Sequence, residues 1–218
     1  MKEKYFTAEN IDQESNEMIE EVKYYSGMRM FKPDHGHMAL LVLDMQRYFL
    51  DTDEHAFVPS APVVIPNIKS IMKSCRGKNI PIIMTRHINT EDDAGMMGVR
   101  WHEIIKEKDP RSRIIDGIGE TGENVMNKGQ FDAFYGTDLE KQLRDAGIRQ
   151  LIITGVMTNL CCESTARSAF IKGFDVVMPV DATAAYNYEF HLATFLNLAY
   201  LFSRPVKTAT LIEHINNA

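Results

Sequence analysis

Three residues at separate points of the chain, Asp44, Lys128 and Cys161, could together carry out hydrolysis. Cys161 follows the apolar run at residues 150–154 and opens a segment that we predict to be a helix. A thiol in the first turn of a helix lies among unpaired backbone N–H groups, at the positive end of the helix dipole, and both stabilise a thiolate. The same N–H groups can stabilise a developing oxyanion. The segment therefore predicts hydrolysis through a covalent thiol intermediate.

The other two residues each close a predicted strand. Asp44 ends the apolar run at residues 38–43, and Lys128 ends a weaker run that begins at residue 124. Taken alone, Asp44 is equally well explained as a helix cap, and Lys128 as a solvated lysine. If the strand order is the common 3-2-1-4-5-6, however, all three residues meet at the carboxyl edge of one parallel sheet, where such sheets bind ligands.

From residue 38 onward, predicted strands alternate with predicted helices. We expect strands at residues 38–43, 80–84, 124–126, 150–154, 174–180 and 206–209, and helices at about 60–77, 137–147, 159–172 and 189–203. This alternation predicts an α/β fold, a three-layer α/β/α arrangement with a parallel six-stranded sheet in the Rossmann-like order 3-2-1-4-5-6.

The chain divides into two parts of unequal size. Residues 1–36 are charged and weakly periodic, and we predict an N-terminal arm that contains a helix and packs on the domain or on a neighbouring subunit. Residues 37–218 are predicted to form the domain itself. The irregular stretch at residues 88–122 is too long for a simple connection, so we expect it to build part of the site.

Composition indicates the class of protein. The 218 residues carry a formal net charge of −6, and 44% are hydrophobic. No apolar run approaches the roughly 20 residues of a membrane helix, and the N-terminus lacks the apolar core of a secretory signal. Two of the three cysteines are adjacent, which leaves no disulfide framework. We expect a cytoplasmic enzyme that acts on a small molecule and binds neither nucleic acid nor membrane.

Three motifs make the chain recognisable: Leu-Asp-Met-Gln at residues 43–46, Lys128 ahead of Phe-Asp-Ala-Phe at 131–134, and Gly-Val-Met-Thr-Asn-Leu-Cys-Cys at 155–162. Over roughly residues 37–212 the chain resembles the isochorismatase-like cysteine hydrolases. That family includes nicotinamidases, N-carbamoylsarcosine and ureidoacrylate amidases, and isochorismate hydrolases. The resemblance implies a catalytic triad of Asp44, Lys128 and Cys161.

The resemblance also implies the surroundings of the triad. It implies a cis peptide between Val156 and Met157, and an oxyanion hole formed by the backbone N–H groups of Met157 and Cys161. The activity implied is cleavage of the C–N bond of a small amide, not a peptide bond, through a thioester and without a cofactor.

Two other functions stay open. Isochorismate hydrolases cleave a vinyl ether and carry glycine in place of the cysteine, so Asp44 and Lys128 could serve such a reaction without the thiol. The chain could also be a non-catalytic binding protein on the same fold, although the intact triad argues against it. Nicotinamidases carry an Asp-x-His metal site after the first strand, which residues 51–55 do not match, and we expect no bound metal.

The substrate pocket is predicted to come from residues 45–60 and 86–122. Candidate substrate-binding residues are Tyr48, Phe49, His87, Trp101 and Phe134. Each also has a structural explanation, as core, packing or a solvated loop side chain. An arginine facing the pocket would favour a carboxylate-bearing substrate, and the candidates are Arg86, Arg100, Arg111 and Arg113.

Other notable residues are better explained by packing. Cys162 and Cys75 lie on apolar helix stripes, and His191 is expected to be structural or capping. The segment at residues 188–202 carries more apolar side chains than one stripe can hold, which predicts a homo-oligomer.

Overall fold

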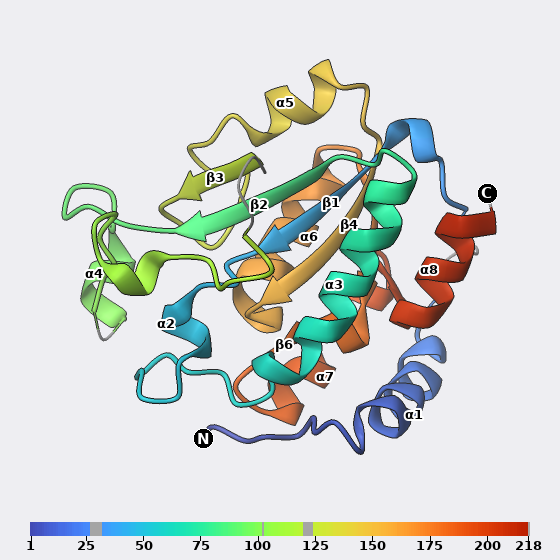
Figure 1. The fold of residues 1–218 in the computed structure, drawn as a ribbon, viewed down its shortest axis with the longest axis horizontal. Helices are drawn as coiled ribbons and strands as arrows, with labels where there is room; N and C mark the ends of the chain where they lie inside the picture. The colour runs from blue at the N-terminus through green and yellow to red at the C-terminus, as the bar shows by residue number, and fades with distance from the viewer. Residues whose placement is uncertain (27–31, 102, 120–123, 218) are drawn as a thin grey trace.

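The computed structural model describes residues 1–218 except 27–31, 102, 120–123 and 218, and Figure 1 shows a parallel sheet between layers of helices. The strands are β1 (Met38–Leu43), β2 (Ile82–His87), β3 (Asn124–Lys128), β4 (Gln150–Val156), β5 (Asp175–Pro179), β6 (Thr183–Ala184) and β7 (Arg204–Val206). The sheet order is β3-β2-β1-β4-β5-β7, with β6 paired to β4. The predicted α/β fold is confirmed, as is the order of its first five strands.

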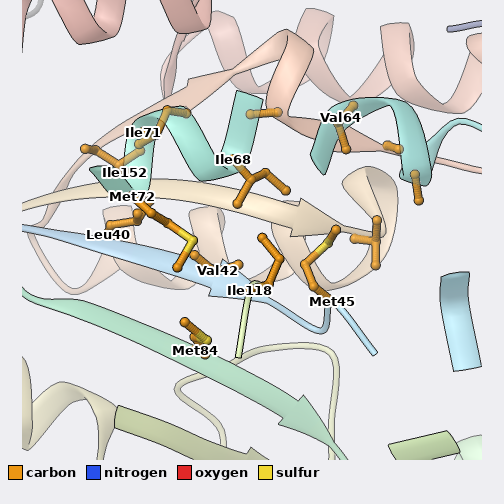
Figure 2. Close-up of a cluster of buried hydrophobic side chains, with 14 of the residues drawn as sticks. Leu40, Val42, Met45, Val64, Ile68, Ile71, Met72, Met84, Ile118 and Ile152 are labelled. Atoms are coloured by element: carbon orange, nitrogen blue, oxygen red, sulfur yellow. The ribbon is translucent and has the colours of Figure 1, made fainter. Parts of the chain in front are cut away.

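The described helices are α1 (Ile11–Lys23), α2 (Arg47–Leu50), α3 (Ala61–Gly77), α4 (Met96–Arg100), α5 (Leu139–Asp145), α6 (Glu163–Ile171), α7 (Tyr188–Ala199) and α8 (Thr208–Asn217). The helix α3 begins with a proline in its first turn, a position that needs no backbone donor. Its apolar stripe, which includes Val64, Ile68 and Ile71, is fully buried against the sheet (Figure 2).

The central strand β1 is buried on both faces, as its continuous apolar run predicts. Leu40 and Val42 pack in the same cluster as the stripe of α3. Leu41 and Leu43 point to the opposite face, into a cluster with residues of α5, α6 and α7. This burial fixes the register of the strand, because a slip of one residue would exchange the two faces.

The last predicted strand was placed wrongly. We expected residues 206–209 to be extended, but β7 ends at Val206 and α8 begins at Thr208. The first turn of α8 is stabilised by Asp181, whose Oδ1 accepts hydrogen bonds from Thr208 N at 2.8 Å and Thr208 Oγ1 at 2.7 Å. The signal for the helix was the spacing of Leu211 and Ile215, both fully buried.

The N-terminal segment packs on the sheet-bearing part of the chain. Phe6 is fully buried, and its N–H donates to Ser60 Oγ at 3.1 Å. Tyr5 Oη accepts a hydrogen bond from Ala185 N at 2.9 Å. The division between an arm and a domain at residue 36 stays a prediction. Within the described residues, no helix has the length and apolarity to cross a membrane.

Apolar side chains remain exposed at the carboxyl ends of α6 and α7. Ile171 is 78% exposed, Tyr200 73% and Leu201 50%, and the rings of Phe170 and Phe202 lie beside them, 5.1 Å apart. We call these five residues the α6–α7 apolar patch. Such a patch on a protein surface is typical of an interaction site.

We predict that the protein forms a homo-oligomer through the α6–α7 apolar patch. Light scattering should give a multiple of the chain mass at micromolar concentration, and the double variant Ile171→Glu, Leu201→Glu should lower that multiple, because buried unpaired carboxylates are costly. Val99→Glu, an exposed apolar position on α4, is the matched control. A monomer mass for the unmodified protein would contradict the prediction.

Candidate active site

The fold brings Asp44, Lys128 and Cys161 together at the carboxyl edge of the sheet. Lys128 Nζ lies 2.7 Å from Asp44 Oδ2 and 3.5 Å from Cys161 Sγ. The side chains of Asp44 and Lys128 have no exposed surface, and Cys161 is 3% exposed. The residues converge because β1 lies beside both β2 and β4, and β3 lies beside β2.

Asp44 is held in a single orientation by its neighbours. Thr85 Oγ1, on β2, donates to Asp44 Oδ1 at 2.6 Å. The backbone N–H of Asp44 points back to the same Thr85 Oγ1, at 3.2 Å. Asp44 has a φ of +52°, which few residues other than glycine adopt. Neither the threonine contact nor this backbone conformation was visible in the sequence.

The segment that carries the nucleophile starts from a close approach of two strands. At Gly155 φ is +105°, and an added Cβ would lie 2.1 Å from the carbonyl oxygen of Leu43. Glycine is therefore required where the ends of β1 and β4 meet. The peptide between Val156 and Met157 is cis. Residues 158–162 then form one wide π-helical turn ahead of α6, so the regular helix begins four residues later than predicted.

His191 anchors this turn from α7. Its ring is fully buried, with Nδ1 2.8 Å from Thr158 Oγ1 and Nε2 3.0 Å from the carbonyl oxygen of Val180. The carbonyl can only accept, so Nε2 donates to it and Nδ1 accepts from the threonine hydroxyl. Burial lowers the pKa of His191 to about 3, which keeps the ring neutral.

The charges in the triad are set by opposing effects. Burial raises the pKa of Asp44, but the charge of Lys128 and hydrogen bonds to the carboxylate more than reverse this, so the net pKa is lowered. For Lys128, burial lowers the pKa, and the neighbouring Asp44 and Cys161 raise it above its ordinary value. Burial, followed by the charge of Asp44, raises the pKa of the Cys161 thiol to about 12. The resting site therefore holds a carboxylate, an ammonium and a thiol.

This charge state bears on one expectation from the sequence. We expected the helix terminus and Lys128 to favour a thiolate at Cys161, and the like charge of Asp44 to oppose it. In the structure, burial and Asp44 outweigh the stabilising effect of Lys128, and the proton stays on sulfur. Asp44 interacts with the Cys161 thiol and, as an ionised carboxylate, can accept that proton.

A cavity of about 380 Å³, its opening included, lies beside Cys161. Its lining residues are Tyr48, Phe49, His87, Asn89, Met97, Trp101, Glu103, Ile104, Ile105, Phe131, Met157, Leu160 and Cys161. Most of these side chains are apolar, as is typical of ligand pockets. The cavity therefore suits a small molecule.

Four of the five candidate substrate-binding residues line this cavity: Tyr48, Phe49, His87 and Trp101. The fifth, Phe134, does not. It stacks on Phe174 with ring centroids 5.8 Å apart, in the cluster on the α5–α6 side of the sheet. Phe131, from the same motif, takes the expected place, with its ring 6.3 Å from that of Trp101.

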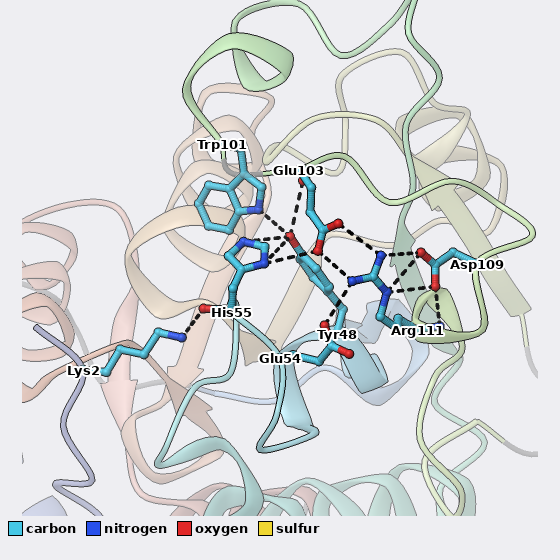
Figure 3. Close-up of polar contacts among 8 residues, drawn as sticks. All are labelled: Lys2, Tyr48, Glu54, His55, Trp101, Glu103, Asp109 and Arg111. Atoms are coloured by element: carbon cyan, nitrogen blue, oxygen red, sulfur yellow. Dashed lines mark hydrogen bonds and ion pairs between the residues drawn. The ribbon is translucent and has the colours of Figure 1, made fainter.

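Tyr48 is the centre of a polar network in the cavity wall (Figure 3). Trp101 Nε1 donates to Tyr48 Oη at 2.9 Å, and His55 Nε2 lies 3.0 Å from the same oxygen. His55 Nδ1 in turn lies 3.3 Å from Glu103 Oε1. The network joins the segment after β1 to the long stretch after β2, and so closes one side of the cavity.

Arg111 belongs to the same network and is surrounded by carboxylates. Its guanidinium lies 2.6 Å from Glu103, 2.7 Å from Asp109 and 3.1 Å from Glu54 (Figure 3). Hydrogen bonds to Asp109 and then to Glu103 raise its pKa further. None of the four candidate arginines is among the described residues that line the cavity.

Two side chains of the segment at residues 51–55 make contacts in the cavity wall. Glu54 is bound to Arg111, and His55 contacts Tyr48 and Glu103. Over the described part of the chain, no group of three or more His, Cys, Asp and Glu side chains is placed to hold a metal ion. Glu54 and His55 therefore help to hold the cavity wall.

Comparison with known proteins places the chain among hydrolases. A family model described as "Isochorismatase domain" matches residues 38–210. Nicotinamidase 3 of Arabidopsis thaliana is 40% identical over 177 residues, which cover 78% of this chain and 85% of that protein. Enterobactin synthase component B of Escherichia coli K12 is 30% identical over 186 residues, covering 84% of this chain and 64% of that protein.

A solved structure supports the fold. The cysteine hydrolase from Pseudomonas syringae pv. phaseolicola 1448A superposes with a TM-score of 0.83 and 24% identity, covering 86% of this chain and 96% of that one. The sequence matches and this superposition together confirm the resemblance drawn from the three motifs.

We predict that acid destabilises the protein through His191. Its folded pKa of about 3 lies below the value near 6.5 of an unfolded histidine, so the unfolded state binds more protons between these values. The free energy of unfolding should fall by about 2 kcal/mol from this residue alone between about pH 7 and about pH 5.

Denaturant titration of the protein and of His191→Gln at both pH values tests this. The variant should be less stable near neutral pH, because it loses packing and a hydrogen bond, yet its stability should change less with pH. Equal pH dependence in the two proteins would contradict the assignment of a neutral buried ring.

Proposed function

We propose that this chain, which belongs to the isochorismatase family of hydrolases, cleaves the C–N bond of a small amide with a triad of Asp44, Lys128 and Cys161. The observation that carries the proposal is that a buried ion pair lies directly beside a thiol. Lys128 lies 2.7 Å from Asp44 and 3.5 Å from Cys161 Sγ, and Cys161 lines a small cavity. An ionised base, a cation and a nucleophile thus meet at one binding site.

The first half of the proposed reaction forms a thioester. Asp44 takes the proton of Cys161, and the sulfur attacks the amide carbon. The N–H groups of Met157 and Cys161 form the oxyanion hole for the tetrahedral intermediate. As the C–N bond breaks, Asp44 returns the proton to the leaving nitrogen, which departs as ammonia or an amine.

The second half releases the acid. Asp44, again a carboxylate, takes a proton from water, whose oxygen attacks the thioester carbon. The C–S bond breaks, and the proton returns from Asp44 to sulfur. Lys128 keeps all of its protons throughout and stabilises whichever of Asp44 and Cys161 carries the negative charge. No step requires a cofactor.

Two other functions are less well supported. Vinyl ether cleavage would use Asp44 and Lys128 alone, and would give the thiol 3.5 Å from Lys128 no role. A binding protein on this fold would gain nothing from a buried ion pair, since burying charges costs free energy. Cytoplasmic location and the absence of a nucleic-acid partner stay predictions from composition.

The cavity favours a substrate without a carboxylate. Arg111, the cation in its wall network, already faces Glu54, Glu103 and Asp109. Glu103 itself lines the cavity. A substrate carboxylate would enter an apolar space beside that negative charge, with no free guanidinium among the described lining residues to compensate. We infer that the natural substrate is a small neutral amide.

Replacing the nucleophile tests the proposed chemistry. Cys161→Ala should lower kcat for amide hydrolysis by at least about 10³-fold, because no other group forms the thioester. Ammonia release from a panel of small amides and ureas measures this. Cys75→Ala, in the core of α3, is the matched control and should retain turnover. If Cys161→Ala kept its amide turnover on every substrate and also cleaved a vinyl ether, the rival function would replace the proposal.

The charge preference can be tested separately. We expect kcat/KM to be about tenfold or more higher for neutral amides than for carboxylate-bearing amides of similar size. A tenfold difference in kcat/KM requires only about 1.4 kcal/mol. Glu103→Gln should make this difference in kcat/KM smaller, because it removes a charge from the cavity wall and partly frees Arg111. Glu91→Gln, an exposed partner of Lys106, is the control. A preference for carboxylate-bearing amides would overturn the inference.

A further inference from the structure

Lys128 has more acceptors than it has protons to donate. Its ammonium carries three N–H groups. Four acceptors surround it: Asp44 Oδ2 at 2.7 Å, the carbonyl oxygen of Gln130 at 2.9 Å, His87 Nδ1 at 3.4 Å and Cys161 Sγ at 3.5 Å. The ion pair with Asp44 and the hydrogen bond to Gln130 take two N–H groups. The third N–H is therefore shared between His87 and Cys161.

His87 is held firmly in place to accept that N–H. It is the direct cross-strand partner of Lys128 in the pairing of β2 with β3. Its backbone N–H donates to Gln46 Oε1 at 2.8 Å, and its carbonyl oxygen accepts from Gln46 Nε2 at 3.0 Å. Gln46 is fully buried, so these two hydrogen bonds are shielded from water.

Asn89 fixes which nitrogen of His87 carries the proton. Asn89 Nδ2 donates to the carbonyl oxygen of Gly129 at 2.7 Å and to Asp93 Oδ1 at 3.0 Å. Asn89 Oδ1 is therefore the atom that faces His87 Nε2, at 2.8 Å, and it can only accept. Nε2 carries the proton, and Nδ1 presents its lone pair to Lys128. Burial and then Lys128 lower the pKa of His87 to about 4, so the ring is neutral.

The strength of the two competing acceptors depends on the state of the sulfur. A neutral imidazole nitrogen is a good acceptor, whereas a thiol sulfur is a weak one. A thiolate is an anion, and a charge-assisted hydrogen bond to it is stronger than one to a neutral ring. The preferred partner of the third N–H therefore changes when Cys161 loses its proton.

We propose that His87 is a positioning residue that holds the third N–H of Lys128 in the resting protein and yields it to Cys161 Sγ when the thiol ionises. The proton moves from Sγ to Asp44, Lys128 keeps its three protons, and only the hydrogen bond changes partner. The inference rests on the triad proposed above. The charged and titratable groups that face this cluster are Asp44, Lys128 and Cys162 around the sulfur, and Asp93 beside His87.

The proposal predicts that removing the acceptor makes the thiol more reactive. In His87→Leu the third N–H would have Cys161 as its sole partner, so the thiolate would form more readily. Iodoacetamide should then modify Cys161 about 3- to 10-fold faster near neutral pH, the effect of one hydrogen bond. In His87→Asn, the amide oxygen can take the place of Nδ1, and the rate should stay within about twofold of the unmodified protein. A merely structural histidine would give slower modification, or equal effects in both variants.

Peptide mapping of the adducts supplies the controls. Cys75 and Cys162 are fully buried and should stay unlabelled as long as the variant is folded. N-ethylmaleimide, a larger reagent, should show the same rate ratio, whereas a change in access would give different ratios for the two reagents. Should His87→Leu fail to fold, His87→Gln, whose amide reaches the Nε2 position and leaves the Nδ1 position empty, serves in its place.

The outcomes are separable from those of the proposed function. An unchanged or slower rate in the acceptor-free variant, reagent-dependent ratios, or an Asn variant that behaves like the Leu variant would each overturn the role of His87. None of these measurements needs a substrate. Absence of amide turnover in the unmodified protein would instead count against the proposed reaction and leave the alkylation result standing.

Discussion

The ion pair between Asp44 and Lys128 is the constraint on which the rest of the site depends. Both side chains are completely buried, 2.7 Å apart. Removing two charges from water is costly, and loss of one partner would leave an uncompensated charge at a cost of about 3–5 kcal/mol. The surroundings reduce the cost by supplying further hydrogen bonds, from Thr85 to Asp44 and from Lys128 to the carbonyl oxygen of Gln130. Strand order and register therefore bring the charged side chains of the site together, in addition to packing the sheet.

The sequence predicted the triad because its three residues lie at strand ends, where the order of the strands determines which residues come together. Continuous apolar runs identified β1 and β4, and their adjacency follows from the common strand order. The end of β2 was harder to predict. We ended that strand at residue 84, but it continues through Thr85 and Arg86 to His87. Polar residues at the carboxyl end of a parallel strand look like a loop, although they can be the part of the strand that builds the site.

The cavity wall was only partly predictable, because irregular segments leave no periodic signal. The aromatic motif at residues 131–134 offered two phenylalanines, and local sequence could not distinguish Phe131, which lines the cavity, from Phe134, which packs on Phe174. Arg111 was a plausible anion receptor until its three carboxylate partners were located, one of which, Glu54, is distant in sequence. Such side chains are positioned by tertiary contacts, which composition and spacing do not encode.

The protonation state of the resting site connects the ion pair to the proposed reaction. Lys128 lowers the pKa of Asp44, while burial and Asp44 raise that of Cys161. The base is thus ionised near neutral pH, but the nucleophile is not, and transfer of the proton from sulfur to Asp44 is unfavourable at rest. A hydrogen bond that Lys128 can redirect towards the sulfur as charge develops there stabilises the product of the transfer more than its starting state. Such differential stabilisation, unlike tight binding of the resting state, accelerates a chemical step.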